Sequence, residues 1–249
     1  MIAQMRIIMG MPITITVAGP VESSVVDAGF DVFASIDQRF STYLADSEIS
    51  RFNRGELREN ELSTDVQEVF ALARLTESES HGYFNMLKSD GRCDPSGIVK
   101  SWAISRCVKL LHDSGLKNFF VDAGGDVQAS GVSEDATPWR VGIRSPFHLG
   151  EIIKVLEPAG AGVATSGSTI RGAHIWNPHA PQVKLDDVLS ITVIGPNILE
   201  ADRFATAAFA MGRDGVNFIE ALPGFEAYQV DALGEATLTS GFRKFEAAS

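Results

Sequence analysis

One lysine in this sequence stands at an unusual place, near the start of a predicted helix. It is Lys100, in the stretch DPSGIVKSWAISRCVKLL from Asp94 to Leu111. The first turn of a helix carries the positive end of the helix dipole, where a cation is disfavoured. Lys100 is therefore either an unimportant surface charge or a residue beside which a negatively charged group is meant to arrive.

A carboxylate and a hydroxyl lie four residues apart in ADRFATAAFAMG, at Asp202 and Thr206. On a helix this spacing places both on one face, one turn apart. Both are hard oxygen donors, which Mg²⁺ prefers, and Mg²⁺ usually takes only one or two protein carboxylates beside water and phosphate. The pattern D-x-x-x-T has little specificity, however, and on its own it favours a structural role for both residues.

Three further segments could bind a ligand. Gly124-Gly125 allow a backbone to approach a ligand closely, but paired glycines are also common in hairpin turns, which the spacing favours. The run Ser166–Ser168 could donate hydrogen bonds to phosphate or form a plain loop, and His174 could be a structural histidine or a base. The chain contains neither a G-x-S-x-G nor a G-x-G-x-x-G motif, so a serine-hydrolase elbow and a classical dinucleotide fold find no support.

Composition excludes several classes of protein. The chain has 249 residues, 45% of them hydrophobic and 21% charged, as in ordinary globular proteins. Its net charge of -11, without a cluster of Lys and Arg, argues against a nucleic-acid partner. No apolar run reaches the roughly 18 residues of a membrane span. The N-terminus shows neither a signal-peptide pattern nor a lipoprotein-type cysteine, so we expect a cytoplasmic protein, or an exported one if a leader was removed.

The two cysteines, Cys93 and Cys107, form no metal-binding pattern, and we expect no disulfide between them. Cys107 falls on the apolar side of a predicted helix, which indicates a buried, unreactive thiol. Cys93 is next to Asp94 and could line a site.

Hydrophobic periodicity predicts helices and strands in mixed order. Helical spacing covers 21–40, 64–80, 94–115 and 200–224, the last with breaks at Gly212 and Gly215, and Ser47 is the predicted N-cap of a short helix. Strand patterns cover 7–17, both sides of Gly124-Gly125, 139–146, 151–167, 189–196 and 227–242. Strands and helices do not alternate strictly, and several strand pairs look like hairpins. We expect an α+β fold of mixed, largely antiparallel sheets with packed helices, in a single domain of residues 1–249.

Six short motifs occur in an order that is far more specific than any one of them. They are MG at 9–10, FSTYLADSEISRFN at 40–53, D-x-x-G-I-x-K at 94–100, AGGDV at 123–127, ATSG with a later arginine and HI-x-N-P at 164–178, and ADRFATAAFAMG at 201–212. In this order the chain resembles the ApbE-type FAD:protein FMN transferases, from about Met9 to Gly212.

The resemblance implies a reaction. Family members transfer the FMN part of FAD to a threonine or serine hydroxyl of an acceptor flavoprotein, with Mg²⁺, and release AMP. Some relatives hydrolyse FAD to FMN and AMP, so an FAD pyrophosphatase is an alternative, and a non-catalytic FAD-binding protein is another. The Asp202/Thr206 pair argues against the last, because simple binding does not need a metal.

The resemblance also implies roles for particular residues. Asp202, Thr206 and the backbone carbonyl of Gly97 match the metal ligands, and Asp94 and Lys100 match an acid and a lysine that contact FAD. Other matched FAD-contacting positions are Met9, Tyr43, Tyr83, Phe84, Asn85 and Ile175. Mg²⁺ and a lysine at a helix N-terminus would neutralise charge on the phosphoryl oxygens and on the departing AMP. His174 and Asp94 are the candidates for a general base.

The chain departs from the family pattern at several positions. The usual MGT is MGM, the usual G-x-F-D is GYFN with Asn85, and the usual K-G is Lys100-Ser101. The usual I-D-P is WNP at Trp176–Pro178, and the segment between Phe84 and Asp94 is shorter than typical. The metal and FAD-phosphate positions are retained, so the departures bear on the choice of acceptor and on transfer itself.

Overall fold

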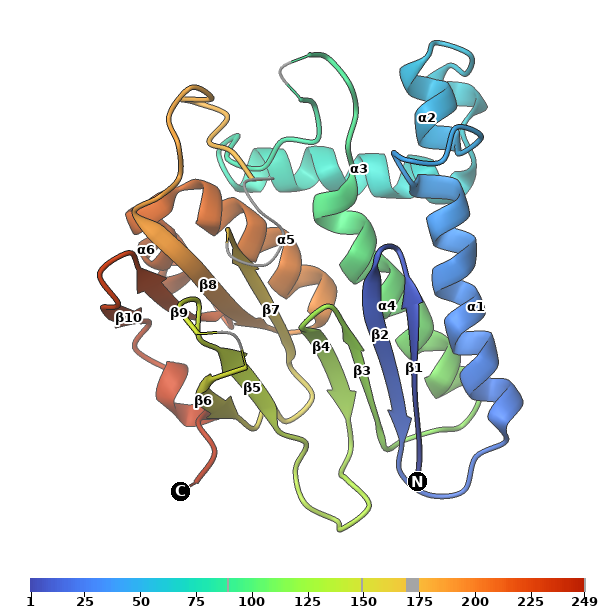
Figure 1. The fold of residues 1–249 in the computed structure, drawn as a ribbon, viewed down its shortest axis with the longest axis vertical. Helices are drawn as coiled ribbons and strands as arrows, with labels where there is room; N and C mark the ends of the chain where they lie inside the picture. Colours follow the sequence, from blue (N-terminus) through green and yellow to red (C-terminus); the bar gives the residue numbers. More distant parts are fainter. Residues whose placement is uncertain (89, 149, 169–174, 249) are drawn as a thin grey trace.

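A computed structural model describes residues 1–88, 90–148, 150–168 and 175–248. Its main sheet has eight strands, all paired antiparallel, in the order β1-β2-β3-β4-β7-β8-β9-β10 (Figure 1). The strands are β1 Ile2–Ile8, β2 Met11–Val17, β3 Phe119–Ala123, β4 Asp126–Ser130, β7 Gly162–Gly167, β8 Val188–Gly195, β9 Glu226–Asp231 and β10 Ala236–Leu238. Together with the packed helices, this antiparallel sheet confirms the predicted α+β class.

Helices cover one face of the main sheet (Figure 1). The helix α4 lies between α1 and α5, α5 packs against β7 and β8, and α3 contacts α4. The helices are α1 Ser23–Phe40, α2 Glu48–Asn53, α3 Thr64–Glu79, α4 Ser96–Asp113, α5 Ile198–Ala210 and α6 Gly215–Glu220, with 3₁₀ turns at Glu59–Glu61, Gly212–Asp214 and Phe242–Phe245. None of the helices in the described ranges is long and apolar enough to cross a membrane.

The other face of the sheet carries a small two-stranded sheet of β5 Val141–Arg144 and β6 Ile152–Leu156. Apolar side chains of β5 and β6 form a second core with those of β4, β7, β8, β9 and the last 3₁₀ turn. The protein therefore has a sheet between two layers, one of them helical and the other small.

The first predicted strand is wrong as a single element. The chain turns at Met9 and Gly10, both of which have positive φ (55° and 71°), and β1 and β2 pair on either side. Two residues with positive φ form the turn that suits the twist of a hairpin. The alternating pattern of 7–17 continues through the turn, so periodicity alone hides it.

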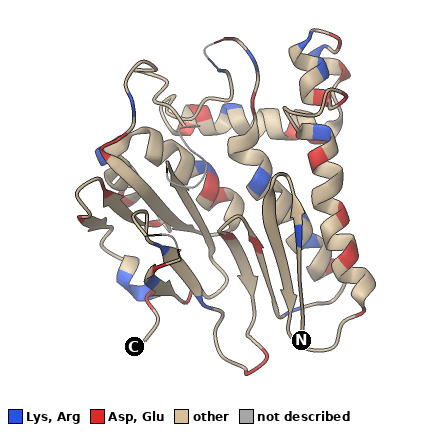
Figure 2. Cartoon of the chain, in the orientation of Figure 1, with Lys and Arg blue, Asp and Glu red and all other residues tan. Residues whose placement is uncertain are grey.

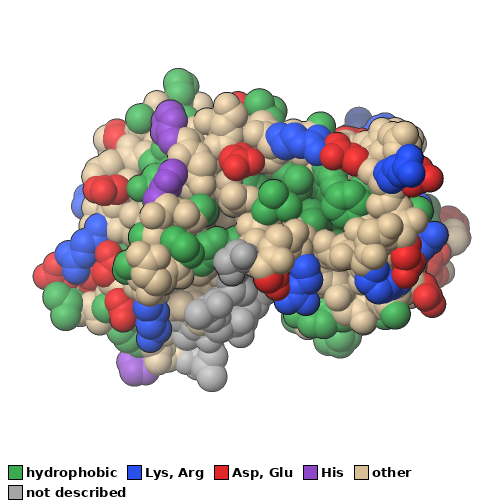
Figure 3. Space-filling view, turned by 90° about the horizontal axis from the view of Figure 1, so that it is seen from above, with side chains coloured by type: hydrophobic (Ala, Val, Ile, Leu, Met, Phe, Trp, Pro, Cys, Tyr) green, Lys and Arg blue, Asp and Glu red, His purple; other side chains and the backbone are tan. Residues whose placement is uncertain are grey.

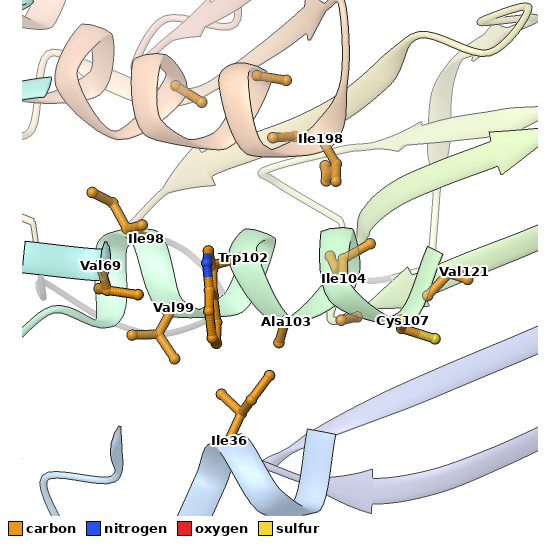
Figure 4. Packing of buried hydrophobic residues seen from close by; sticks show 14 of the residues in the cluster. Ile36, Val69, Ile98, Val99, Trp102, Ala103, Ile104, Cys107, Val121 and Ile198 are labelled. Carbon is orange, nitrogen blue, oxygen red and sulfur yellow. The ribbon is translucent and has the colours of Figure 1, made fainter. Parts of the chain in front are cut away.

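The helical core is built around α4 (Figure 4). Trp102 and Ile104 of α4 pack with Ile36 of α1, Val121 of β3 and Ile198 of α5. Every residue of α4 from 98 to 104 is buried, because other elements surround this part of the helix. The early turns of α4 are therefore interior, and this places Lys100 inside the protein.

Candidate functional site

A cleft of about 1280 Å³ opens at the end of the sheet where the β1–β2 turn, the β3–β4 turn and the first turn of α4 meet. It is larger than the ~300–1,000 Å³ typical of small-molecule sites. Every predicted site residue that the structure describes lines this cleft: Met9, Tyr43, Tyr83, Phe84, Asn85, Asp94, Gly97, Lys100, Ile175, Asp202 and Thr206. His174 lies outside the described residues.

In the described residues, Lys and Arg positions are scattered over helices and loops and are interspersed with Asp and Glu (Figure 2). Seen from the end with the β1–β2 turn and α3, apolar side chains gather within a border of charged ones (Figure 3). This surface fits a ligand with both an aromatic and a charged part better than a purely ionic one.

Lys100 lies between two buried carboxylates. Its Nζ contacts Asp126 Oδ2 and is 3.5 Å from Asp202 Oδ1. The exposed fractions are 8% for Lys100, 1% for Asp126 and 2% for Asp202. Of the two interpretations of Lys100, the surface charge is wrong, because the side chain is buried beside two carboxylates of the protein. The arrival of a negatively charged ligand stays a prediction.

Asp126 was not among the predicted site residues. It is the first residue of β4, after the turn at Gly124-Gly125, and its Oδ1 accepts a hydrogen bond from Thr165 N (3.0 Å). The hairpin turn predicted at the two glycines is confirmed, with φ of 64° and 101°. The signal for Asp126 was a lone acid directly after paired glycines, which is common in hairpins without any function.

Three residues with oxygen donors, one of them Asp202 of this cluster, line the cleft together. Asp202 and Thr206 are one turn apart in α5, and Gly97 is the second residue of α4. A Cβ atom added to Gly97 would be 2.9 Å from Phe84 Cε2 and 3.5 Å from Thr206 Cγ2. This close packing brings the backbone of α4 next to the side chains of α5 and explains why glycine occupies position 97.

The donor chemistry fits Mg²⁺. A carboxylate, a hydroxyl and a carbonyl are hard donors, and Mg²⁺ completes such a partial set with water and phosphate oxygens. Within the described ranges, no group of three or more His, Cys, Asp or Glu is placed to hold a metal. The residues present therefore suit an ion shared with a phosphate ligand rather than one held by protein side chains alone.

Asp94 lies just before α4, lines the cleft and is paired with Lys88. Its Oδ2 is 2.6 Å from Lys88 Nζ, and its Oδ1 accepts a hydrogen bond from Ser96 N (3.1 Å). Burial raises the pKa of Asp94, but the hydrogen bonds from Lys88 and Ser96 outweigh it and leave the pKa below the ordinary 3.8. Asp94 is thus an anion at neutral pH and a weak base.

Apolar and aromatic residues form the rest of the wall. Met9 is fixed in the β1–β2 turn, where its N–H donates to Asp37 Oδ2 (3.3 Å). Tyr43 is 96% exposed at the rim, whereas Phe84 is buried and Ile175 packs against the core. The apolar and aromatic side chains in this part of the cleft suit a ring system.

The segment 83–85 is held by local contacts. Tyr83 packs edge-on against His179, with ring centroids 4.6 Å apart. The Oδ1 of Asn85 accepts a hydrogen bond from Leu87 N (2.7 Å), so it stabilises its own turn. Residues 83–85 thus line the cleft, and the side chain of Asn85 also stabilises the loop in which it lies.

Asp122 and Arg144 also line the cleft and were not predicted. Burial raises the pKa of Asp122, while the hydrogen bond from Gly125 N (2.7 Å) and the charge of Arg144 act in the opposite direction. Arg144 belongs to β5, a strand whose sequence carries no sign of a site.

Both cysteines are buried, free thiols. Burial raises the pKa of Cys93 and of Cys107 to about 12. The prediction for Cys107 is confirmed. Cys93 lines only a small side cavity of about 220 Å³ and does not line the main cleft.

Comparison with known proteins gives a consistent set of relatives. A model of the ApbE family matches residues 9–90 and 86–229. The FAD:protein FMN transferase of Vibrio cholerae serotype O1 is 27% identical over 165 residues, which are 63% of this chain and 48% of the relative. The FAD:protein FMN transferase of Escherichia coli K12 is 26% identical over 155 residues, 59% of this chain and 44% of the relative. The chain spans about half the length of the curated relatives it matches.

Solved structures share the fold. The flavin transferase ApbE from Vibrio cholerae superimposes with a TM-score of 0.84 over 98% of each chain, at 21% identity. The ApbE protein from Thermotoga maritima also gives 0.84, over 99% of each chain, at 19% identity.

Proposed function

This chain belongs to the ApbE family, and we propose that it transfers the FMN part of FAD to a threonine or serine hydroxyl of an acceptor flavoprotein, with Mg²⁺, and releases AMP. The observation that carries the proposal is the shared cleft. Residues far apart in the sequence, from Met9 to Thr206, line a single cavity around a buried lysine and two buried carboxylates. We further propose that residues 1–249 act as one domain, because β1 and β10 belong to the same sheet.

The reaction exchanges one phosphoester bond for another. The acceptor oxygen forms a bond with the phosphorus of the FMN part, and the bond from that phosphorus to the bridging oxygen breaks. AMP leaves with the electron pair of the broken bond, and the proton of the acceptor hydroxyl is released. The site must therefore hold a pyrophosphate and stabilise negative charge on the leaving oxygen.

Lys100 supplies a positive charge for this purpose. It lies near the N-terminus of α4, where the helix dipole also favours an anion. Asp202, Thr206 and the Gly97 carbonyl would hold Mg²⁺, which when bound neutralises phosphoryl oxygens. In a cleft that excludes water, fixed charges of this kind stabilise a transition state strongly.

Among the candidates for a general base, Asp94 is weakened by its low pKa and its contact with Lys88. His174 stays a candidate. The apolar wall with Met9, Tyr43 and Ile175 would take the ring system of FAD, and the exposed Tyr43 lies where an acceptor would approach.

The test is incubation of the protein with FAD, Mg²⁺ and a candidate acceptor flavoprotein, followed by chromatography for AMP and intact mass of the acceptor. AMP together with an acceptor heavier by one FMN unit supports transfer. AMP with free FMN and an unchanged acceptor identifies a pyrophosphatase instead, and bound FAD without AMP identifies a binding protein.

Two variants sharpen this test. Asp202→Ala removes the carboxylate of the metal site, and we expect it to abolish Mg²⁺-dependent AMP release. The matched control is Asp231→Asn, because Asp231 is also buried and near an arginine (Arg213, 3.5 Å) but does not line the cleft. Equal rates for Asp202→Ala and the wild type would refute the metal assignment.

A further inference from the structure

Asp126 lies in the motif AGGDV, to which the resemblance assigned no role, and its carboxylate contacts both β7 and Lys100. Two strands fix it: it begins β4, and its Oδ1 accepts from Thr165 N of β7 (3.0 Å). Its other oxygen contacts Lys100 Nζ. With 1% of its surface exposed, this carboxylate is held in one orientation by the sheet, and its remaining oxygen is directed at the lysine.

Lys100 has two carboxylates within reach, and they are not equivalent. Asp126 is in direct contact with the ammonium group, whereas Asp202 Oδ1 is 3.5 Å away. Asp202 belongs to the proposed metal site, and Asp126 does not. A lysine that paired fully with Asp202 would compete with a metal ion for the same carboxylate, because both are cations.

We propose that Asp126 is a positioning residue that holds the Lys100 ammonium group in direct contact with itself, so that the lysine pairs less closely with Asp202. It thereby limits the competition between Lys100 and a divalent metal for the Asp202 carboxylate and keeps the lysine beside the cleft where the pyrophosphate of FAD would bind. The inference rests on the proposed function for its ligand, but the arrangement itself is a property of the three side chains.

The proposal makes the effect of Asp126 on metal binding depend on Lys100. With Asp126→Asn, the amide oxygen still accepts from Thr165 N, but the negative charge is lost, and Lys100 has Asp202 as its remaining carboxylate partner in the cluster. With Lys100→Met, the ammonium group that competes for Asp202 is absent, so the proposed route from Asp126 to the metal site through the lysine is removed. Partners that orient a metal-binding group typically affect metal affinity by about 10- to 100-fold.

The experiment is a double-mutant cycle on Mn²⁺ affinity, measured by electron paramagnetic resonance with saturating ADP. ADP offers the adenosine pyrophosphate part of FAD without an FMN group to transfer. We expect Asp126→Asn to weaken Mn²⁺ binding by about 10- to 100-fold. We expect Lys100→Met and Lys100→Met/Asp126→Asn to agree with each other within a factor of about two. Asp231→Asn, a buried carboxylate outside the cleft, should bind Mn²⁺ as the wild type does.

Two results would overturn the proposal. One is an Asp126→Asn variant that binds Mn²⁺ as tightly as the wild type. The other is an equal loss with and without Lys100, which would mean that Asp126 acts on the metal directly or only through the fold. Circular dichroism establishes that each variant is folded under the assay conditions.

A second variant covers the case in which Asp126→Asn does not fold. Asp126→Glu keeps the charge but moves it by one methylene group, so its contact with Lys100 changes while a carboxylate remains. Its Mn²⁺ affinity should fall at least about threefold and the loss should vanish in the Lys100→Met background; wild-type affinity for this variant counts against the proposal. None of these measurements requires turnover. A wild-type protein that releases no AMP therefore refutes the proposed function, whereas the role of Asp126 is decided separately by the Mn²⁺ affinities.

Discussion

Replacement of Lys100 by methionine should destabilise the protein although Lys100 is a candidate site residue. Methionine keeps much of the length and apolar volume of the lysine side chain but removes the ammonium group. The change leaves Asp126 and Asp202, exposed by 1% and 2%, without the cation that contacts one and lies 3.5 Å from the other. Buried carboxylates that lose their cation are costly, because neither water nor an opposite charge compensates them.

The size of the effect follows from this burial. Removal of one partner from a buried ion pair typically costs about 3–5 kcal/mol. For a protein of this length, about 1 kcal/mol corresponds to a shift of roughly 2–4 °C in the melting temperature. We therefore expect Lys100→Met to melt roughly 6–20 °C below the wild type. A second change, Asp126→Asn, removes one of the two buried carboxylate charges that Lys100 contacts in the wild type and should restore part of the loss.

The assay is thermal unfolding followed by circular dichroism at neutral pH, without FAD or divalent metal. The control is Lys154→Met, which breaks the ion pair with Glu246 (2.6 Å) that is about one-third exposed. Because solvent screens that pair, its loss should cost no more than about 1 kcal/mol. A Lys100→Met variant that melts within about 2 °C of the wild type would show that Lys100 does not form a stabilising buried ion pair with Asp126 and Asp202.

Three other substitutions or treatments give separate tests. Gly97→Ala places a Cβ 2.9 Å from the ring of Phe84. We expect the free energy of unfolding in urea to fall by about 1–3 kcal/mol and Mg²⁺-dependent turnover to decrease. Wild-type values for both would show that α4 packs less tightly against Phe84. Ser47→Ala removes the cap that accepts from Ser50 N (3.0 Å), and urea unfolding should show a loss of about 0.5–2 kcal/mol. Cys93 and Cys107, with pKa values raised to about 12 by burial, should both resist a thiol reagent at pH 8 in the native protein and react after denaturation; rapid native labelling would contradict their burial.

Local patterns predicted the elements of the fold well where periodicity and caps agreed. The helix predicted at 64–80 is α3, Thr64–Glu79, and the predicted cap Ser47 accepts from Ser50 N. The hairpin at Gly124-Gly125 was also predicted, because its turn chemistry is local. The order of strands in the main sheet was not predictable in this way, since pairs such as β4 with β7 join residues distant in the sequence.

The error in the first strand has the same origin. The sequence alternates from 7 to 17, but alternation continues across a two-residue turn, so the pattern could not separate one strand from two. The turn depends on Met9, a residue type that rarely adopts positive φ, instead of the usual Asn-Gly or Asp-Gly. The hairpin matters for the site, because it brings Met9 to the wall of the cleft.

Local sequence patterns and the family resemblance indicated different residues of the candidate site. Spacing alone placed Asp202 and Thr206 on one face of a helix but did not distinguish a metal site from a structural pair. The resemblance added Asp94, Gly97 and Lys100, and the structure brings all of them to one cleft. The resemblance included Asp126 only as part of the motif AGGDV and assigned it no role, because its contact from β4 to Lys100 of α4 is one that no sequence spacing encodes.

Lys100 contributes both to the stability of the fold and to the candidate site. A cation near the start of a helix is unfavourable in isolation, and burial makes it more so. The fold offsets both effects by directing Asp126 from the sheet and Asp202 from α5 toward the same ammonium group. In the proposed function, Asp202 also contributes its carboxylate to the metal site, and Asp126 fixes the lysine beside it. The same three buried residues thus stabilise the folded protein and, in the proposed function, serve the chemistry of the site.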